Sequence, residues 1–211
     1  GHRAGLLTMA TGTGKTRMSI ALIELLMRGN WVKRVLFLAD RVALVNQATG
    51  EFKKHLPDSS PVNLVTDKNG QGRVYLCTYP TMMGLIEQME GDRRTYGVGH
   101  FDLIVIDEAH RSVYQKYGAI FRYFDSYLVG LTATPRDEVD RDTYHLFGLE
   151  TGVPTDAYGL SEAVDDGYLV PPTAYSVPIK FVREGIRYDQ LSDAEKEHWE
   201  SLDWGDYSAE G

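Results

Sequence analysis

The most constraining feature of this 211-residue chain is a continuous apolar run at residues 103–106 that ends in two carboxylates, Asp107 and Glu108. A strand without polar alternation is typical of a parallel sheet that is covered on both faces. Further strand-like segments occupy residues 6–9, 35–39, 62–65, 73–77 and 127–131, and they alternate with helical patterns at 15–27, 41–55, 81–89, 114–124 and 140–146. This alternation predicts an α/β fold built from βαβ units, with a mostly parallel sheet and helices on both faces.

Between the run at 6–9 and the helical pattern from residue 15 lies a glycine-rich segment, Thr11-Gly12-Thr13-Gly14-Lys15-Thr16. A glycine-rich turn from strand to helix is the setting of a phosphate-binding loop, because its backbone N–H groups and the helix N-terminus favour anions. We expect Lys15 to reach the β- and γ-phosphates of a nucleotide and the Thr16 hydroxyl to bind Mg²⁺. Met9 departs from the usual pattern, which has Gly or Ala there, and a plain glycine-rich turn is the alternative interpretation.

The two carboxylates stand where a buried strand emerges at its carboxyl end, which is the edge at which parallel sheets bind ligands. Asp107 is suited to hold Mg²⁺ through its water shell, and Glu108 is suited to orient or deprotonate an attacking water. Together with Lys15 they form the predicted catalytic set. A strand end followed by a helix cap is the alternative, but it explains two adjacent acids poorly beside a phosphate loop.

Five segments resemble, in order and spacing, the motifs of the first motor domain of a superfamily 2 helicase or translocase with a DEAH box. They are residues 11–16 (motif I), Ala39-Asp40-Arg41 (motif Ia), Cys77-Thr78-Tyr79 (motifs Ib and Ic), Asp107-Glu108-Ala109-His110 (motif II) and Leu131-Thr132-Ala133-Thr134-Pro135 (motif III). Within the superfamily, the stretches at 7–16, 36–41 and 167–172 look most like the motor (R) subunit of type I restriction enzymes. The resemblance implies a RecA-like P-loop NTPase domain, and an ATP hydrolase coupled to translocation on double-stranded DNA.

The resemblance also implies roles for residues outside the two main motifs. Thr132 and Thr134 would couple the nucleotide site to a nucleic-acid groove, and His110 would contact this motif III region. A partly buried, hydrogen-bonded histidine is the alternative for His110. Arg41 and Thr78 would touch the sugar-phosphate backbone of nucleic acid, which positions a duplex without reading its sequence. For Arg41 the alternative is a solvated surface cation.

The implied cofactors are ATP and Mg²⁺. The implied partners are double-stranded DNA, the modification and specificity subunits of a restriction complex, and a second motor domain of the same polypeptide. We expect residues 1–155 to form the first motor domain, and residues 156–211 to form a connector and an acidic tail that lead to the second.

Within a type I restriction endonuclease the nuclease site would lie outside this chain, and the isolated chain would hydrolyse ATP slowly or not at all. One alternative function is that of another superfamily 2 DNA or RNA helicase. A second, from a different class, is a non-hydrolysing nucleotide-dependent clamp or structural module.

The formal net charge of −8 is concentrated in residues 184–211, which hold nine acidic and two basic residues. The rest of the chain is near neutral, which neither indicates nor excludes a nucleic-acid groove. No run approaches the roughly 18 to 20 apolar residues of a membrane helix. The single cysteine, Cys77, is predicted to be a buried packing thiol and suits a reducing cytoplasm. The chain lacks an initiator Met and enters an apolar run within five residues, so we expect a piece of a longer polypeptide.

Overall fold

The computed structural model describes residues 2–109, 111–134, 139 and 141–173, nearly all of which belong to one compact unit that ends at Pro171. The helices are α1 (Lys15–Arg28), α2 (Val42–His55), the short 3₁₀ helix η1 (Pro57–Ser59), α3 (Tyr79–Glu87), α4 (Arg111–Tyr123), α5 (Arg141–Leu146) and α6 (Leu160–Asp165). The strands are β1 (Ala4–Met9), β2 (Val35–Ala39), β3 (Val62–Asn63), β4 (Val74–Thr78), β5 (Met89–Glu90), β6 (Arg93–Arg94), β7 (Leu103–Asp107), β8 (Tyr127–Thr132) and β9 (Asp156–Tyr158). The acidic tail at 184–211 lies outside the described residues.

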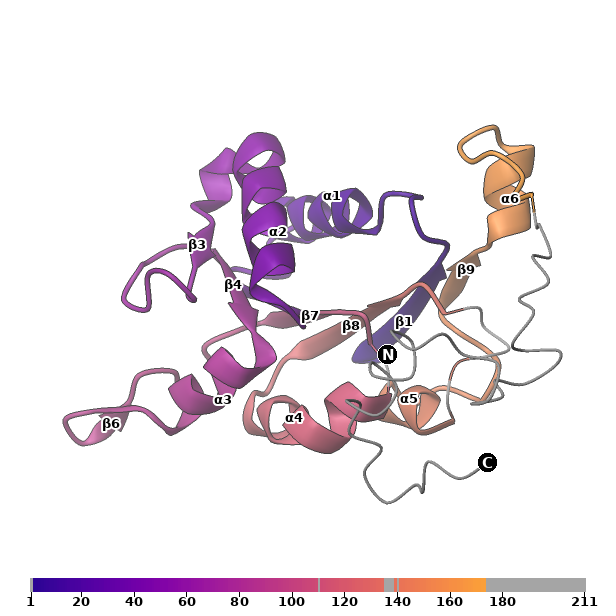
Figure 1. Cartoon of the computed structure of the whole chain (residues 1–211). Coiled ribbons are helices and arrows are strands. Elements are labelled where there is room, and N and C mark those ends of the chain that lie inside the picture. Colours follow the sequence, from indigo (N-terminus) through magenta and orange to yellow (C-terminus); the bar gives the residue numbers. More distant parts are fainter. Residues whose placement is uncertain (1, 110, 135–138, 140, 174–211) are drawn as a thin grey trace, which may run out of the picture. The chain divides into compact units, whose positions relative to one another are not determined.

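Seven of these strands form one sheet in the order β3-β4-β2-β7-β8-β1-β9, and its paired strands run parallel throughout. Figure 1 shows α1 and α2 on one face of this sheet and α3, α4 and α5 on the other. The predicted α/β fold with a mostly parallel sheet is therefore confirmed. Strands β7, β8 and β1 are neighbours in this order and run parallel. Their carboxyl ends therefore lie side by side at one edge of the sheet.

The period of two along each strand explains how one sheet serves two hydrophobic cores. In β2, Leu36 and Leu38 pack into the core beneath α3, α4 and α5. Their neighbours Val35, Phe37 and Ala39 pack into the core beneath α1 and α2. All five side chains are buried, which explains why the sequence of this strand is an uninterrupted apolar run.

The sheet extends beyond the boundary that we expected at residue 155. Strand β9 pairs with β1, with Leu7 opposite Asp156 and Met9 opposite Tyr158. A strand of three residues without an apolar run has no periodic signal, so the sequence did not predict it. The β5–β6 hairpin was likewise not predicted, since each of its strands has only two residues, all of them exposed.

Two local polar interactions move element ends away from the predicted positions. Helix α3 begins at Tyr79 rather than at residue 81, because the Thr78 hydroxyl caps it by accepting from the Thr81 backbone N–H at 3.4 Å. Strand β3 stops at Asn63 rather than at residue 65, because the Asn63 side-chain oxygen accepts from the Val65 N–H at 3.0 Å and turns the chain.

The lone cysteine lies in β4 and is fully buried, as predicted. Burial raises the pKa of the Cys77 thiol to about 12, so the sulfur stays protonated and packs as a small apolar group. Across the part of the chain that the structure describes, no helix combines the length and the apolar character that crossing a membrane requires.

Candidate nucleotide site

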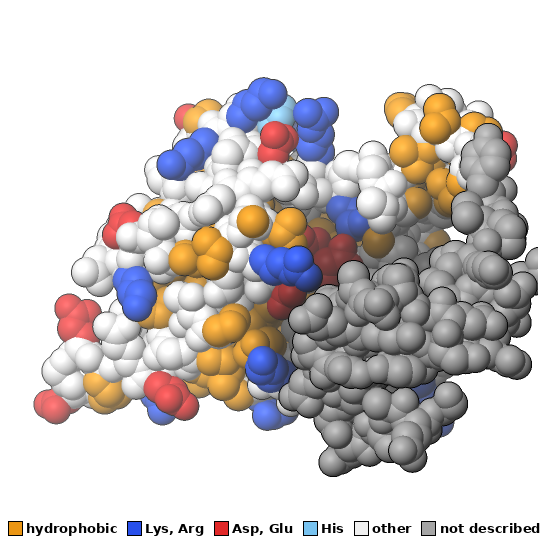
Figure 2. Space-filling view, viewed as in Figure 1, with side chains coloured by type: hydrophobic (Ala, Val, Ile, Leu, Met, Phe, Trp, Pro, Cys, Tyr) orange, Lys and Arg blue, Asp and Glu red, His pale blue; other side chains and the backbone are white. Residues whose placement is uncertain are grey.

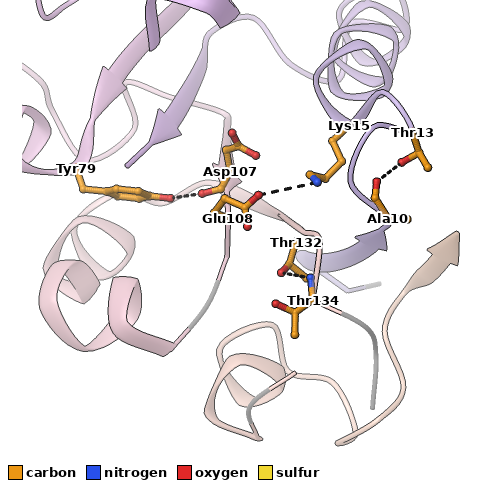
Figure 3. Close-up of polar contacts among 8 residues, drawn as sticks. All are labelled: Ala10, Thr13, Lys15, Tyr79, Asp107, Glu108, Thr132 and Thr134. Carbon is orange, nitrogen blue, oxygen red and sulfur yellow. Dashed lines mark hydrogen bonds and ion pairs between the residues drawn. The ribbon is translucent and has the colours of Figure 1, made fainter. Parts of the chain in front are cut away.

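The predicted phosphate loop connects the carboxyl end of β1 to the first turn of α1. Gly12 and Gly14 have φ angles of 86° and 91°, a backbone region that glycine enters without steric cost. The Thr13 hydroxyl donates to the Ala10 carbonyl at 2.6 Å and closes the turn (Figure 3). Since the N-cap residue is Gly14, no side chain caps α1. The first N–H groups of this helix therefore stay open to an anionic ligand.

The acidic turn lies across β8 from this loop and faces it. The Lys15 Nζ is 3.9 Å from the Glu108 Oε1, so the sheet brings together two motifs that are distant in sequence (Figure 3). The Lys15 side chain is 13% exposed and the Glu108 side chain 39% exposed, so the pair sits at the wall of an open site. Figure 2 shows acidic side chains gathered in the middle of this face with Lys or Arg side chains beside them.

The carboxyl of Asp107 is held in an environment that disfavours its charge. Burial raises its pKa, and the neighbouring Glu108 carboxylate raises it further, whereas the Lys15 ammonium acts in the opposite direction. Two acids that share one lysine carry more negative charge than the site neutralises. Such a site gains from a bound cation.

The backbone at Glu108 is unusual. Its φ is +54°, in the left-handed region that side chains other than glycine rarely adopt. The next residue, Ala109, donates its N–H to the Leu131 carbonyl of β8 at 2.8 Å. On the other side, the Tyr79 hydroxyl donates to the Asp107 carbonyl at 2.8 Å (Figure 3). Sequence reasoning did not identify Tyr79 as a site residue, since no local pattern connects positions so far apart.

The predicted coupling residues Thr132 and Thr134 lie at and just beyond the carboxyl end of β8, between the phosphate loop and the acidic turn. Thr132 is 1% exposed and lies opposite Thr8 of β1 in the parallel register. Its hydroxyl accepts from the Thr134 backbone N–H at 3.1 Å, which bends the chain just after the strand (Figure 3). His110, the third predicted coupling residue, lies outside the described residues.

The two predicted nucleic-acid contacts follow neighbouring strands at the same edge of the sheet. Arg41 is the exposed N-cap residue of α2, and its Nε lies 3.7 Å from the Asp40 Oδ2. Thr78 ends β4 opposite Ala39, is 6% exposed and uses its hydroxyl to cap α3. Arg41 is therefore open to a ligand, whereas Thr78 is engaged in the fold.

A cleft of about 700 Å³ opens on the β9 side of the phosphate loop. Thr11 of the loop and Thr134 after β8 both contribute to its wall. The remaining lining comes from residues 8–10 at the end of β1, from Ala133, and from residues 157–162, which sequence reasoning assigned to a connector. The start of that connector is thus part of the site's surroundings.

The residues at this edge fit a magnesium ion that arrives with a nucleotide. Within the described ranges, no group of three or more His, Cys, Asp or Glu side chains is arranged to hold a metal ion. Mg²⁺ in nucleotide sites is held by one or two protein groups together with phosphate oxygens and water. The Thr16 hydroxyl at the start of α1 and the Asp107 carboxylate at the end of β7 are donors of that kind.

Comparison with protein families and curated sequences agrees with this geometry. The family ResIII, described as "Type III restriction enzyme, res subunit", matches residues 1–137. The chain is 34% identical over 194 residues to the endonuclease subunit of the type I restriction enzyme EcoAI from Escherichia coli, covering 89% of this chain and 23% of that protein. It is 30% identical over 226 residues to the EcoKI endonuclease subunit from Escherichia coli strain K12, covering 93% of this chain and 18% of that protein. The chain thus spans about a fifth of the length of these relatives.

Solved structures show the same fold. A fragment of an HsdR subunit of a type I restriction enzyme from Vibrio vulnificus YJ016 aligns with a TM-score of 0.56 and 29% identity, over 79% of this chain and 28% of that one. The SWI2/SNF2 ATPase core of Sulfolobus solfataricus aligns with a TM-score of 0.55 and 19% identity, over 68% of this chain and 31% of that one. The second likeness concerns the fold alone.

Proposed function

Since this chain belongs to the ResIII family, we propose that it is the first motor domain of a restriction endonuclease subunit, in which ATP hydrolysis drives translocation on double-stranded DNA. One observation carries the proposal: Lys15 of the phosphate loop and Glu108 of the acidic turn meet at 3.9 Å, at the carboxyl edge of a parallel sheet. The similarity to type I endonuclease subunits supports the restriction complex, with its modification and specificity subunits, as the setting.

In the proposed reaction, the chain's residues bind and orient ATP and an attacking water. The N–H groups at the start of α1 and the Lys15 ammonium hold the phosphates. Thr16 and Asp107 would hold Mg²⁺, which would supply neutralisation of the charge that develops on the phosphates. Glu108 orients the water and accepts its proton. Its carboxylate points toward the phosphate loop, as this role requires.

We further propose that the segment after β8 links the nucleotide site to the DNA groove. Ala109 is hydrogen-bonded to Leu131, and the chain from there runs directly to Thr132 and Thr134. A change at the acidic turn therefore has a short covalent and hydrogen-bonded route to these residues. Arg41, exposed at the same edge of the sheet, is the best placed of the predicted contacts to meet a DNA phosphate.

The test is ATP hydrolysis by the full-length polypeptide with double-stranded DNA, single-stranded DNA and RNA compared side by side. Glu108→Gln, which keeps the shape of the side chain but removes the base, serves as the low-activity reference. Greater stimulation by double-stranded DNA than by the other two is the expected result. Stimulation by RNA alone would move the assignment to an RNA helicase. Nucleotide binding without any turnover would favour a nucleotide-dependent clamp.

A further inference from the structure

Tyr79, which has no role in the proposed reaction, links the start of α3 to the end of β7 through a hydrogen bond. It follows β4, which is separated from β7 by β2 in the sheet. The pairing of β2 with β7 ends at Leu38 and Ile106, one residue before Asp107. The Tyr79 hydroxyl reaches past this end and donates to the Asp107 carbonyl at 2.8 Å. The bond therefore holds the backbone of β7 just where the β2 ladder no longer does.

The position of Tyr79 is itself firmly set. Its side chain is fully buried, and its ring stacks on that of Tyr117 in α4 with centroids 5.3 Å apart and planes 13° from parallel. Burial, followed by the negative charges of Asp107, Asp40 and Glu108, raises the pKa of Tyr79 well above its ordinary value. The hydroxyl thus stays protonated at neutral pH and remains able to donate.

The bond bears directly on the direction of the Glu108 side chain. The φ angle of Glu108 describes rotation about the bond between its nitrogen and its Cα, so it depends on the orientation of the peptide group between Asp107 and Glu108. Tyr79 fixes that peptide through its carbonyl, and the Ala109 N–H, bonded to Leu131, fixes the next one. With both neighbouring peptides held, φ at Glu108 stays at +54° and its carboxylate points toward Lys15.

We propose that Tyr79 is a positioning residue for Glu108: its hydroxyl locks the peptide before Glu108 and so aims the carboxylate at the attacking water. This inference rests on the proposed hydrolysis of ATP. Without the hydroxyl, this peptide is held only from the β8 side, where Asp107 pairs with Leu131, and Glu108 relaxes toward a negative φ, the region that non-glycine residues favour. The carboxylate then turns away from the phosphate loop.

The experiment compares Tyr79→Phe with Tyr123→Phe in the full-length polypeptide. Tyr123→Phe is a matched control, because its hydroxyl also donates to a backbone carbonyl, that of Tyr96 at 2.6 Å, but away from the site. In DNA-stimulated ATP hydrolysis, Tyr79→Phe is expected to lower kcat at least about tenfold. Its KM and its affinity for a non-hydrolysable ATP analogue are expected to stay within about twofold, because the phosphate loop is untouched.

A double-mutant cycle separates positioning from a general structural role. In a Glu108→Gln background, Tyr79→Phe is expected to cause no further loss, because the side chain that it aims has lost its function. Unchanged kcat in Tyr79→Phe, or an equal fractional loss in both backgrounds, would overturn the inference. A Tyr79→Phe protein that does not fold, while Tyr123→Phe folds, would overturn it too, since the hydroxyl would then serve the fold. If the wild-type protein itself hydrolyses no ATP with any nucleic acid, the proposed function fails first, and the inference with it.

Discussion

The tightest backbone packing beside the site is at Gly130, in the centre of β8, and we predict that Gly130→Ala destabilises the protein. A Cβ built at this position would lie 2.4 Å from the Cζ of Phe147 and 3.0 Å from the Cβ of Ala109. Phe147 is 2% exposed, so its ring has no room in which to turn aside. Gly130 also pairs with Leu6 of β1 and Ile106 of β7, so β8 is held from both sides.

The magnitude follows from the overlap. The nearest contact is about 1 Å shorter than an ordinary carbon–carbon contact, and overpacking of this kind costs about 1 to 3 kcal/mol. Alanine recovers up to about 1 kcal/mol through the reduced entropy of the unfolded chain. We therefore expect a net loss of about 1 to 1.5 kcal/mol in the free energy of unfolding, which corresponds to a fall in Tm of roughly 3 to 5 °C for a chain of this length.

Urea unfolding followed by circular dichroism measures this loss. Gly50→Ala is the matched control, because Gly50 lies within α2 and nothing stands within 4 Å of its built Cβ. It should stabilise the protein by about 0.5 to 1 kcal/mol. Phe147→Leu, which removes the outer ring atoms, should relieve part of the cost in a double mutant with Gly130→Ala. If Gly130→Ala matches the wild type in stability, the packing argument is wrong.

Two further substitutions test the electrostatics and the capping of the site. The raised pKa of Asp107 means that the folded protein keeps a proton there at pH values at which the unfolded chain has released it, so the ligand-free protein loses stability as the pH rises through that interval. Asp107→Asn should remove this loss and raise the Tm at neutral pH, while abolishing hydrolysis; thermal unfolding from about pH 4 to pH 8 measures it, and an unaltered pH profile would contradict it. Thr78→Ala should cost about 1 kcal/mol in urea unfolding, because the Thr81 N–H loses its cap. Thr78→Ser keeps the hydroxyl and should differ from the wild type by less than about 0.5 kcal/mol, so equal losses in both variants would refute the capping role.

The sequence predicted the buried strands well because burial on both faces leaves a strong local signal. The run at 35–39 is β2 residue for residue, and the run at 103–106 lacks only Asp107 of β7. The elements that it missed depend on distant partners. Strand β9 forms because it pairs with β1, about 150 residues earlier in the chain. No property of residues 156–158 alone predicts that pairing.

The site divides in the same way. Lys15, Asp107 and Glu108 were predicted from their neighbours in sequence, and the strand order then explains why Lys15 and Glu108 face each other. Thr78 illustrates the limit of such reasoning, since motif order alone does not reveal that its hydroxyl is already used to cap α3. Tyr79 is one residue further along and contacts the acidic turn only because β4 and β7 end at the same edge.

The geometry around Glu108 also ties the stability of β8 to the aim of this side chain. The Ala109 N–H is bonded to the Leu131 carbonyl, so the peptide after Glu108 follows β8 when that strand shifts. Gly130 is the residue immediately before Leu131, and its built Cβ also meets Ala109. A methyl group added at Gly130 would displace Ala109 and with it the peptide that follows Glu108. It would also shift the segment of β8 that leads to Thr132. Gly130→Ala should therefore lower kcat for ATP hydrolysis even under conditions in which the protein remains fully folded, an effect that a loss of stability alone does not produce.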